Sequence, residues 1–266
     1  MDYVTPLLTN QADKVVWGTA DGKIDENGSI AYYYFDDASG FRIVCTDSNY
    51  SWNEAKQEWQ HNTTNSYGSP TGNTKPNSLG DVHLTWLEYV LTDAAEKSIP
   101  CVVLSHATMS GSWEPSPDSD AVQTIFRKVN TIQKGTVLLA LNGHNHQDHM
   151  KIVDDVVYID INTVRNGFWD GNGQTHYTEE QTFEYVKYNA DGSVASTQNA
   201  PLNSLSSGAT TWFFEEPLSA NIRISTAGYI HVDGWETTWM YDVDPGLTEG
   251  QARSPWISDY KIEFLY

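Results

Sequence analysis

Basic residues are scarce in this chain of 266 residues, which carries 15 Lys and Arg against 35 Asp and Glu, for a formal net charge of -20. A nucleic-acid-binding face needs clustered Lys and Arg, and an anionic membrane surface attracts the same residues. The charge balance therefore argues against both kinds of partner. Acidity of this size favours solubility.

Long apolar runs and cysteines are also few. No stretch reaches the roughly 20 apolar residues of a membrane-spanning helix, and the first residues show neither the basic nor the apolar region of a signal peptide. The two cysteines, Cys45 and Cys101, each lie in an apolar run. This favours buried strand cysteines over a disulfide that would indicate an oxidising compartment, and the localisation stays unknown.

What the chain does contain is a regular alternation of apolar patterns between residues 41 and 141. Strand-like runs cover 41–46, 101–105 and 136–141, and helical periodicity covers 82–97 and 118–133. Strand, helix, strand, helix, strand in this order predicts a parallel sheet with right-handed crossovers.

The helix predicted at 82–97 has the clearest pattern. One apolar stripe along it is formed by Val82, Trp86, Leu87, Val90, Leu91 and Ala94. We expect Asp81 or Ser78 to cap its start, because short polar side chains satisfy the free N–H groups of a first helical turn.

The remaining segments suggest strands and one long loop. Runs at 29–35 and 41–46 flank a turn that ends in glycine and predict a hairpin. Residues 48–80 have little periodicity and predict a long loop. A second hairpin is predicted at 150–161, and from about residue 170 the pattern is almost entirely that of strands.

Histidines follow two of the predicted strands. His106 comes after the run 101–105, and His144 and His146 belong to a Gly-His-x-His step after the run 136–141. Ligands gather outside the carboxyl ends of strands in α/β proteins, and imidazole suits ions such as Zn, Fe and Ni. On these residues alone, a metal site and ordinary hydrogen-bonded histidines are about equally supported.

Neighbouring side chains are weaker candidates. His149 would extend the histidine cluster, and Asp148 or Asp160 would orient a ligating imidazole through its other nitrogen, although a solvated surface position is the simpler expectation for each. Ser105 has no Gly-x-Ser-x-Gly elbow around it, which argues against a serine nucleophile. Asn142 suits a turn better than a phosphate contact.

Two blocks of this chain resemble the calcineurin-like metallophosphoesterase superfamily. The lone strand-end histidine of that family corresponds to Val102-Val103-Leu104-Ser105-His106, and its last block corresponds to Gly143-His144-Asn145-His146. The helix with Trp86-Leu87 stands before the first of these blocks, as in the family. The resemblance covers roughly residues 30 to 165. It implies an α/β fold of mixed α+β type, with a layered sheet sandwich flanked by helices.

The family's upstream blocks are absent from this chain. It contains no Asp-x-His, no metal-bridging Gly-Asp and no Gly-Asn-His-Asp; Gly80-Asp81 imitates the second block, but its place before a helix favours a cap. We therefore expect residues 1–170 to be the C-terminal half of a metallophosphoesterase-like domain, with the N-terminal half missing. Residues 171–266 are expected to be a β-rich continuation packed on the same sheet system.

The resemblance implies a metal-dependent phosphoesterase, in which metal-activated water hydrolyses a phosphomonoester or phosphodiester. It assigns His146 to a first metal ion and His106 and His144 to a second, and it leaves the catalytic residues unknown. The expected cofactor is a divalent ion of Zn, Mn or Fe type, with one ion or none in this chain, because the anionic ligands are absent. We expect the chain to be weakly active or inactive.

The alternative is a non-catalytic binding module that presents aromatic side chains to a glycan or protein partner, for which 10 Trp and 15 Tyr are available. The partner of an active enzyme would be a phosphorylated small molecule or a phosphodiester, with neither nucleic acid nor membrane involved. A homo-oligomer through an exposed sheet edge is expected in either case.

Overall fold

The computed structural model is of mixed α/β type, as expected, with one large mixed sheet. The residues it describes are 15–18, 24–25, 31–61, 73–110, 116–144, 148–162, 164, 166–169, 182–188, 193–201, 211–213, 216–225, 228–238 and 256–263. No helix in these ranges is long and apolar enough to cross a membrane.

The chain divides into two compact units. The first comprises Met1–Asn142 and Val153–Tyr158, and the second comprises Gly143–Ile152 and Ile159–Tyr266. The boundary predicted at residue 170 lies outside the described residues and stays a prediction, as does the packing of the β-rich part on the same sheet system.

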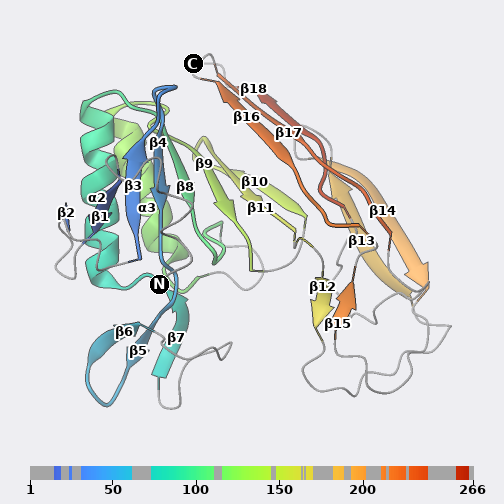
Figure 1. The fold of residues 1–266 in the computed structure, drawn as a ribbon, viewed down its shortest axis with the longest axis horizontal. Helices are drawn as coiled ribbons and strands as arrows, with labels where there is room; N and C mark the ends of the chain where they lie inside the picture. Colours follow the sequence, from blue (N-terminus) through green and yellow to red (C-terminus); the bar gives the residue numbers. More distant parts are fainter. Residues whose placement is uncertain are drawn as a thin grey trace. The chain divides into compact units, whose positions relative to one another are not determined.

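The largest sheet has eight strands in the order β10-β11-β9-β8-β4-β3-β1-β2 (Figure 1). Their bounds are β1 Val16–Gly18, β2 Ile24–Asp25, β3 Tyr33–Asp36, β4 Arg42–Cys45, β8 Cys101–Leu104, β9 Val137–Asn142, β10 His149–Val153 and β11 Val156–Asp160. β4 pairs parallel with β8 and β8 with β9, whereas β3 pairs antiparallel with β4. The predicted hairpin and the predicted parallel strands are therefore confirmed.

Two helices, α2 (Asp81–Glu96) and α3 (Ser119–Ile132), pack beside each other against this sheet (Figure 1). Their buried faces join the strands in one apolar cluster around the fully buried Trp86. The predicted stripe is confirmed except for Val82, which is 40% exposed. Both helices match their predicted bounds to within one residue, because their apolar spacing follows the helical repeat.

The predicted cap of α2 is wrong. Gly80 occupies the N-cap position and makes no side-chain capping bond, and Ser78 donates its hydroxyl to the Lys75 carbonyl instead. The carboxylate that meets this helix start is that of Asp118, the N-cap residue of α3, which accepts the backbone N–H groups of Leu79 at 2.7 Å and Gly80 at 3.1 Å.

Residues 48–80 are not the featureless loop that the sequence suggests. They contain a three-stranded sheet in the order β6-β5-β7, with β5 at Tyr50–Asn53, β6 at Glu58–His61 and β7 at Asn73–Ser78. β5 and β6 form a hairpin in which Trp52 lies opposite Trp59 and Tyr50 lies opposite His61.

Beyond β11, the second unit consists of strands in the residues that the structure describes. Its strands beyond β11 are β12 Asn166–Trp169, β13 Thr182–Tyr188, β14 Val194–Pro201, β15 Thr211–Phe213, β16 Asn221–Ser225, β17 Tyr229–Asp233 and β18 Tyr260–Glu263. They form antiparallel sheets of two or three strands, in which β12 pairs with β15, β13 with β14, and β17 with both β16 and β18.

Both cysteines are free thiols in neighbouring strands, as expected for buried strand cysteines. Cys45 ends β4 and Cys101 begins β8. Burial raises the pKa of the Cys101 thiol to about 12 and also raises the pKa of Cys45.

Candidate functional site

Three parallel strands of the first unit end in register. Leu104 of β8 lies opposite Leu141 of β9 and Cys45 of β4. Just beyond these pairs, Ser105 donates its N–H to the Leu141 carbonyl at 3.0 Å, and Thr46 donates its N–H to the Leu104 carbonyl at 2.9 Å. The carboxyl ends of β4, β8 and β9 therefore form one edge, which is where α/β proteins place ligands.

The predicted metal ligands follow two of these strands. His106 comes two residues after β8 and is exposed. His144 comes two residues after β9, is partly buried and has a left-handed φ of 66°, a conformation that non-glycine residues adopt mainly in constrained loops. His146 lies outside the described residues.

The described residues contain no group of three or more His, Cys, Asp and Glu side chains placed to hold a metal ion. Because one of the three predicted ligands, His146, lies outside those residues, the predicted set is not tested and stays a prediction. The strands that precede these histidines in the sequence, β8 and β9, are parallel neighbours.

Buried polar atoms without partners lie at the same strand ends. Within the described part of the chain, the Ser105 hydroxyl and both side-chain amide atoms of Asn142 make no hydrogen bond. Asn142 is 3% exposed and is the last residue of β9, not a turn residue. Each such group costs roughly 1–3 kcal/mol of stability when it is left unsatisfied, so this edge offers buried polar atoms to which a polar ligand could bind.

A carboxylate–imidazole pair lies after the third strand, β4. The Oδ2 atom of Asp47 lies 2.9 Å from Nε2 of His61 in β6, and the Asp47 side chain is 12% exposed against 40% for His61. The hydrogen bond to Asp47 raises the pKa of His61, and burial opposes it. The ring of Tyr50 meets the His61 ring edge-on at 5.1 Å between centroids. The Asp47 carboxylate therefore favours the protonated form of the His61 ring.

His83 of α2 is a buried imidazole whose pKa is shifted in the opposite direction from that of His61. It is 1% exposed, stacks on Tyr32 at 3.9 Å between ring centroids, and among the described residues neither of its ring nitrogens has a hydrogen-bond partner. Burial lowers its pKa to about 3, against a weaker opposing influence of Asp47. His83 is therefore neutral at physiological pH.

Asp148, in the second unit, is not the solvated carboxylate that the sequence suggests. It is 5% exposed and accepts hydrogen bonds from the Ser258 N–H at 3.1 Å, the Ser258 hydroxyl at 2.6 Å and the Tyr260 hydroxyl at 3.0 Å. Burial raises its pKa, and the donors from Ser258 and Tyr260 oppose that shift. The carboxylate fastens the start of β18 to the segment that follows the Gly-His-x-His step.

His149 and Asp160 are also paired in the second unit. Nδ1 of His149 lies 3.0 Å from Oδ2 of Asp160, and the two side chains are 24% and 2% exposed. The surface position expected for both residues is therefore wrong for Asp160. The pair fits the idea that Asp160 orients an imidazole, although the imidazole that it orients is that of His149.

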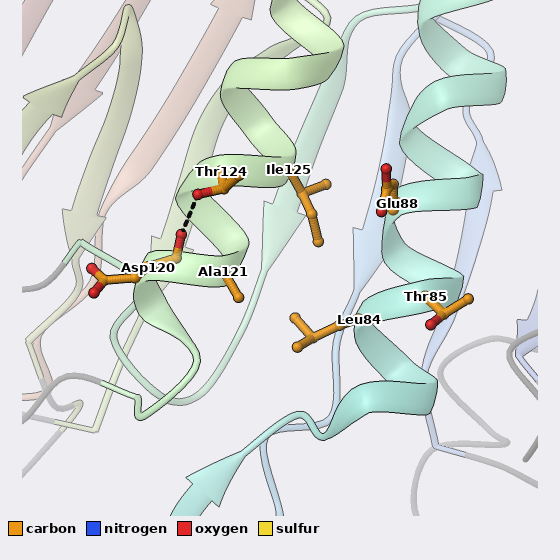
Figure 2. Close-up of a pocket in the computed structure, with 7 residues that line it drawn as sticks. All are labelled: Leu84, Thr85, Glu88, Asp120, Ala121, Thr124 and Ile125. Atoms are coloured by element: carbon orange, nitrogen blue, oxygen red, sulfur yellow. Dashed lines mark hydrogen bonds between the residues drawn. The ribbon is translucent and has the colours of Figure 1, made fainter.

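The described residues also form a groove between the two helices. Figure 2 shows Leu84 of α2 and Ile125 of α3 facing each other across it, with Glu88 and Asp120 at its sides. Its volume is about 410 Å³. No residue predicted for the metal site lines it.

The sequence-based search missed Asp47, His61 and His83. A signal for Asp47 was present, because it follows the apolar run 41–46 just as His106 follows the run 101–105. His61 carried no such signal, since its hairpin is short and mostly polar.

No family model matches this sequence, and no curated protein matches it. Among solved structures, the chain is similar to a dimetal phosphatase from Danio rerio, with a TM-score of 0.47 and 12% sequence identity. The match covers 90% of this chain and 62% of that one, so this chain spans less than two thirds of the neighbour's length. At this TM-score the match carries no functional argument, and the proposal below rests on the residues of this chain.

Proposed function

We infer that this chain carries part of the metal site of a metal-dependent phosphoesterase, with His106, His144 and His146 as ligands. One observation supports the proposal: β8 and β9 are parallel neighbours in register, and in the sequence the lone histidine follows β8 and the Gly-His-x-His step follows β9. In α/β proteins, ligands bind at this edge.

The three proposed ligands would suit a divalent ion. Three neutral imidazoles form a donor set that proteins use for Zn²⁺, and imidazole also suits Fe. The unsatisfied Ser105 hydroxyl and Asn142 amide add polar atoms at the same strand ends. A bound ion would supply Lewis acidity to a phosphoryl oxygen and would lower the pKa of water.

The absence of acidic blocks in the sequence sets the expected activity. Two dications a few ångströms apart repel each other, and neutral imidazoles do not offset that repulsion as a bridging carboxylate does. We therefore expect one ion at most and slow hydrolysis of phosphomonoesters or phosphodiesters by residues 1–266.

Metal analysis of the purified chain tests this proposal. Wild-type protein should retain close to one equivalent of Zn, Mn or Fe after dialysis, and His106→Ala, His144→Ala and His146→Ala should each weaken binding at least tenfold. His231→Ala, a change of the same type in β17, should bind as the wild type does. A chain that retains no ion would favour the non-catalytic binding module instead.

Self-association through a sheet edge is a separate proposal. β2 and β10 are the outer strands of the eight-stranded sheet, and unpaired strand edges tend to pair with another chain. Light scattering on the protein as it elutes from a size-exclusion column should give a mass above that of one chain. A monomer at all concentrations would contradict self-association.

A further inference from the structure

One buried hydrogen bond ties the segment after β4 to the segment that carries His106. The Ala107 N–H donates to the Ser48 hydroxyl at 3.0 Å, and both residues are buried. Asp47 immediately precedes Ser48, and His106 immediately precedes Ala107. The bond therefore joins the two segments at Ser48 and Ala107. Asp47 and His106 each lie one residue before the bonded residue of their own segment.

Asp47 in turn holds His61. The β5–β6 hairpin sets His61 opposite Tyr50, and Nε2 of the ring lies 2.9 Å from the Asp47 carboxylate. The other Asp47 oxygen accepts the Asn49 N–H at 3.0 Å, which fixes the carboxylate in place. With Nε2 engaged by Asp47, the imidazolium form carries its second proton on Nδ1, and the ring is 40% exposed to incoming molecules.

We propose that His61, oriented by Asp47, is the proton donor to the leaving oxygen in phosphoester hydrolysis at this strand edge. The proposal rests on the function proposed above, because the segment of Asp47, which holds the donor, is bonded to the segment that carries His106. Hydrolysis of an alkyl phosphoester breaks the bond between phosphorus and the leaving oxygen, while a water oxygen forms a new bond to phosphorus and the water releases a proton to solvent. The proton on Nδ1 of His61 passes to the leaving oxygen to give the alcohol, and the neutral imidazole regains a proton from solvent.

The groups around His61 favour this role. Asp47 stabilises the imidazolium form, so the pKa of His61 is raised and more of the ring is protonated at neutral pH. Tyr50 stays neutral there, because burial, with a smaller contribution from Asp47, raises its pKa to about 12. His83, which also senses Asp47, is neutral and adds no positive charge that would expel the proton.

The leaving group provides the test, because an acid matters only when the departing oxygen is basic. Hydrolysis of 4-nitrophenyl phosphate, which has a good leaving group, is compared with hydrolysis of an alkyl phosphate, which has a poor one, in the presence of Zn²⁺ or Mn²⁺. His61→Gln should lower kcat on the alkyl ester by roughly 10²-fold and on the nitrophenyl ester by less than about 3-fold. His231→Gln, a histidine beside Tyr229 in β17, is the matched control and should change neither.

Asp47→Asn keeps the acceptor for the Asn49 N–H but removes the negative charge. It should lower the pKa of His61, read directly from the imidazole proton shifts in an NMR titration. The loss of alkyl phosphate hydrolysis at high pH should move to lower pH by the same interval. A purely structural role for the pair predicts neither shift.

The outcomes separate the two proposals. Equal losses on both esters in His61→Gln, with an active wild type, would overturn the proton-donor role and leave the metal site standing. A wild type with no metal-stimulated hydrolysis of either ester would overturn the phosphoesterase and, with it, the role of His61.

Discussion

In the first unit the buried side chains around Trp86 are almost all apolar and come from both helices and from strands on either side of β8. In the second unit, Ile230, Val232 and Ile262 are buried in short antiparallel strands, and a buried carboxylate, Asp148, crosses to Ser258 and Tyr260. The cluster around Trp86 therefore depends on apolar area removed from water, whereas the attachment of β18 to Asp148 depends on polar groups that must stay paired.

Each unit also buries a titratable side chain. His83 has no hydrogen-bond partner among the described residues, whereas Asp148 accepts three hydrogen bonds. Burial favours the neutral form of both groups, since it lowers the pKa of His83 and raises that of Asp148. The comparison teaches that the burial of His83 is tolerated by neutralisation, whereas that of Asp148 is tolerated by hydrogen bonding.

Trp86→Ala should have the largest effect. It removes a fully buried side chain from the centre of the apolar cluster, and such truncations cost roughly 3–5 kcal/mol in free energy of unfolding. Urea denaturation followed by circular dichroism measures the loss. Tyr89→Ala on the same helix, where the side chain is 56% exposed, should change stability by less than about 0.5 kcal/mol; equal losses would contradict an apolar core centred on Trp86.

Acidification should destabilise the chain through His83. Its folded pKa of about 3 lies below the unfolded value of 6.5, so the unfolded chain binds a proton that the folded chain rejects, and stability falls as pH drops from 6.5 towards 3. At pH 4 the loss is on the order of 3 kcal/mol. His83→Leu should flatten the dependence of unfolding free energy on pH in this window; an unchanged slope would show that His83 is hydrated or paired.

Asp148→Asn should weaken the second unit by a smaller amount, about 1–3 kcal/mol. The amide nitrogen cannot accept a hydrogen bond, so the Ser258 N–H, the Ser258 hydroxyl and the Tyr260 hydroxyl would compete for the one remaining acceptor atom. Amide hydrogen exchange along β17 and β18 should speed up. Asp233→Asn, in an ion pair with Arg223 whose side chains are 51% and 56% exposed, is the control and should leave that exchange unchanged.

Arg127→Gln should have the smallest effect. Its ion pair with Asp154 joins side chains that are 55% and 42% exposed, and exposed pairs contribute about 0–1 kcal/mol. Thermal unfolding in low and high salt should differ little between variant and wild type. A loss comparable to that of Asp148→Asn would mean that surface charge contributes as much as buried polar pairing.

The first unit was largely predictable from the sequence because its patterns are long. The stripe through Trp86 and Leu91 repeats over four turns, and Val102 and Val103 lie in an apolar run that suits a strand covered on both faces. Helix spacing and uninterrupted strands are local properties. The order of these elements then limits the sheet to few topologies.

The candidate site was predictable only in part. His106 and His144 stand directly after such runs, so their strand-end positions follow from the sequence. Asp47 and His61 meet only because a short hairpin folds back, and Asp148 meets Ser258 across 110 positions. Contacts of that kind depend on tertiary packing, which no local pattern encodes.

The start of α2 at Gly80 also depends on a contact that no local pattern encodes. Asp81 satisfied the usual preference for a polar cap, yet the acceptor came from Asp118, 38 residues away. A cap supplied from another element gives the same electrostatic benefit to the free N–H groups, and the sequence around Gly80 alone does not distinguish the two solutions.

The reactivity of the Cys101 thiol, at the start of β8, provides a way to measure how often the parallel sheet opens. With a pKa of about 12, only about one molecule in 10⁵ carries the thiolate at pH 7, and the thiolate is the species that reacts with alkylating agents. Modification of Cys101 must therefore wait until the sheet opens. Its labelling rate, compared with that of the less buried Cys45, would report how often the strands that carry the candidate site separate.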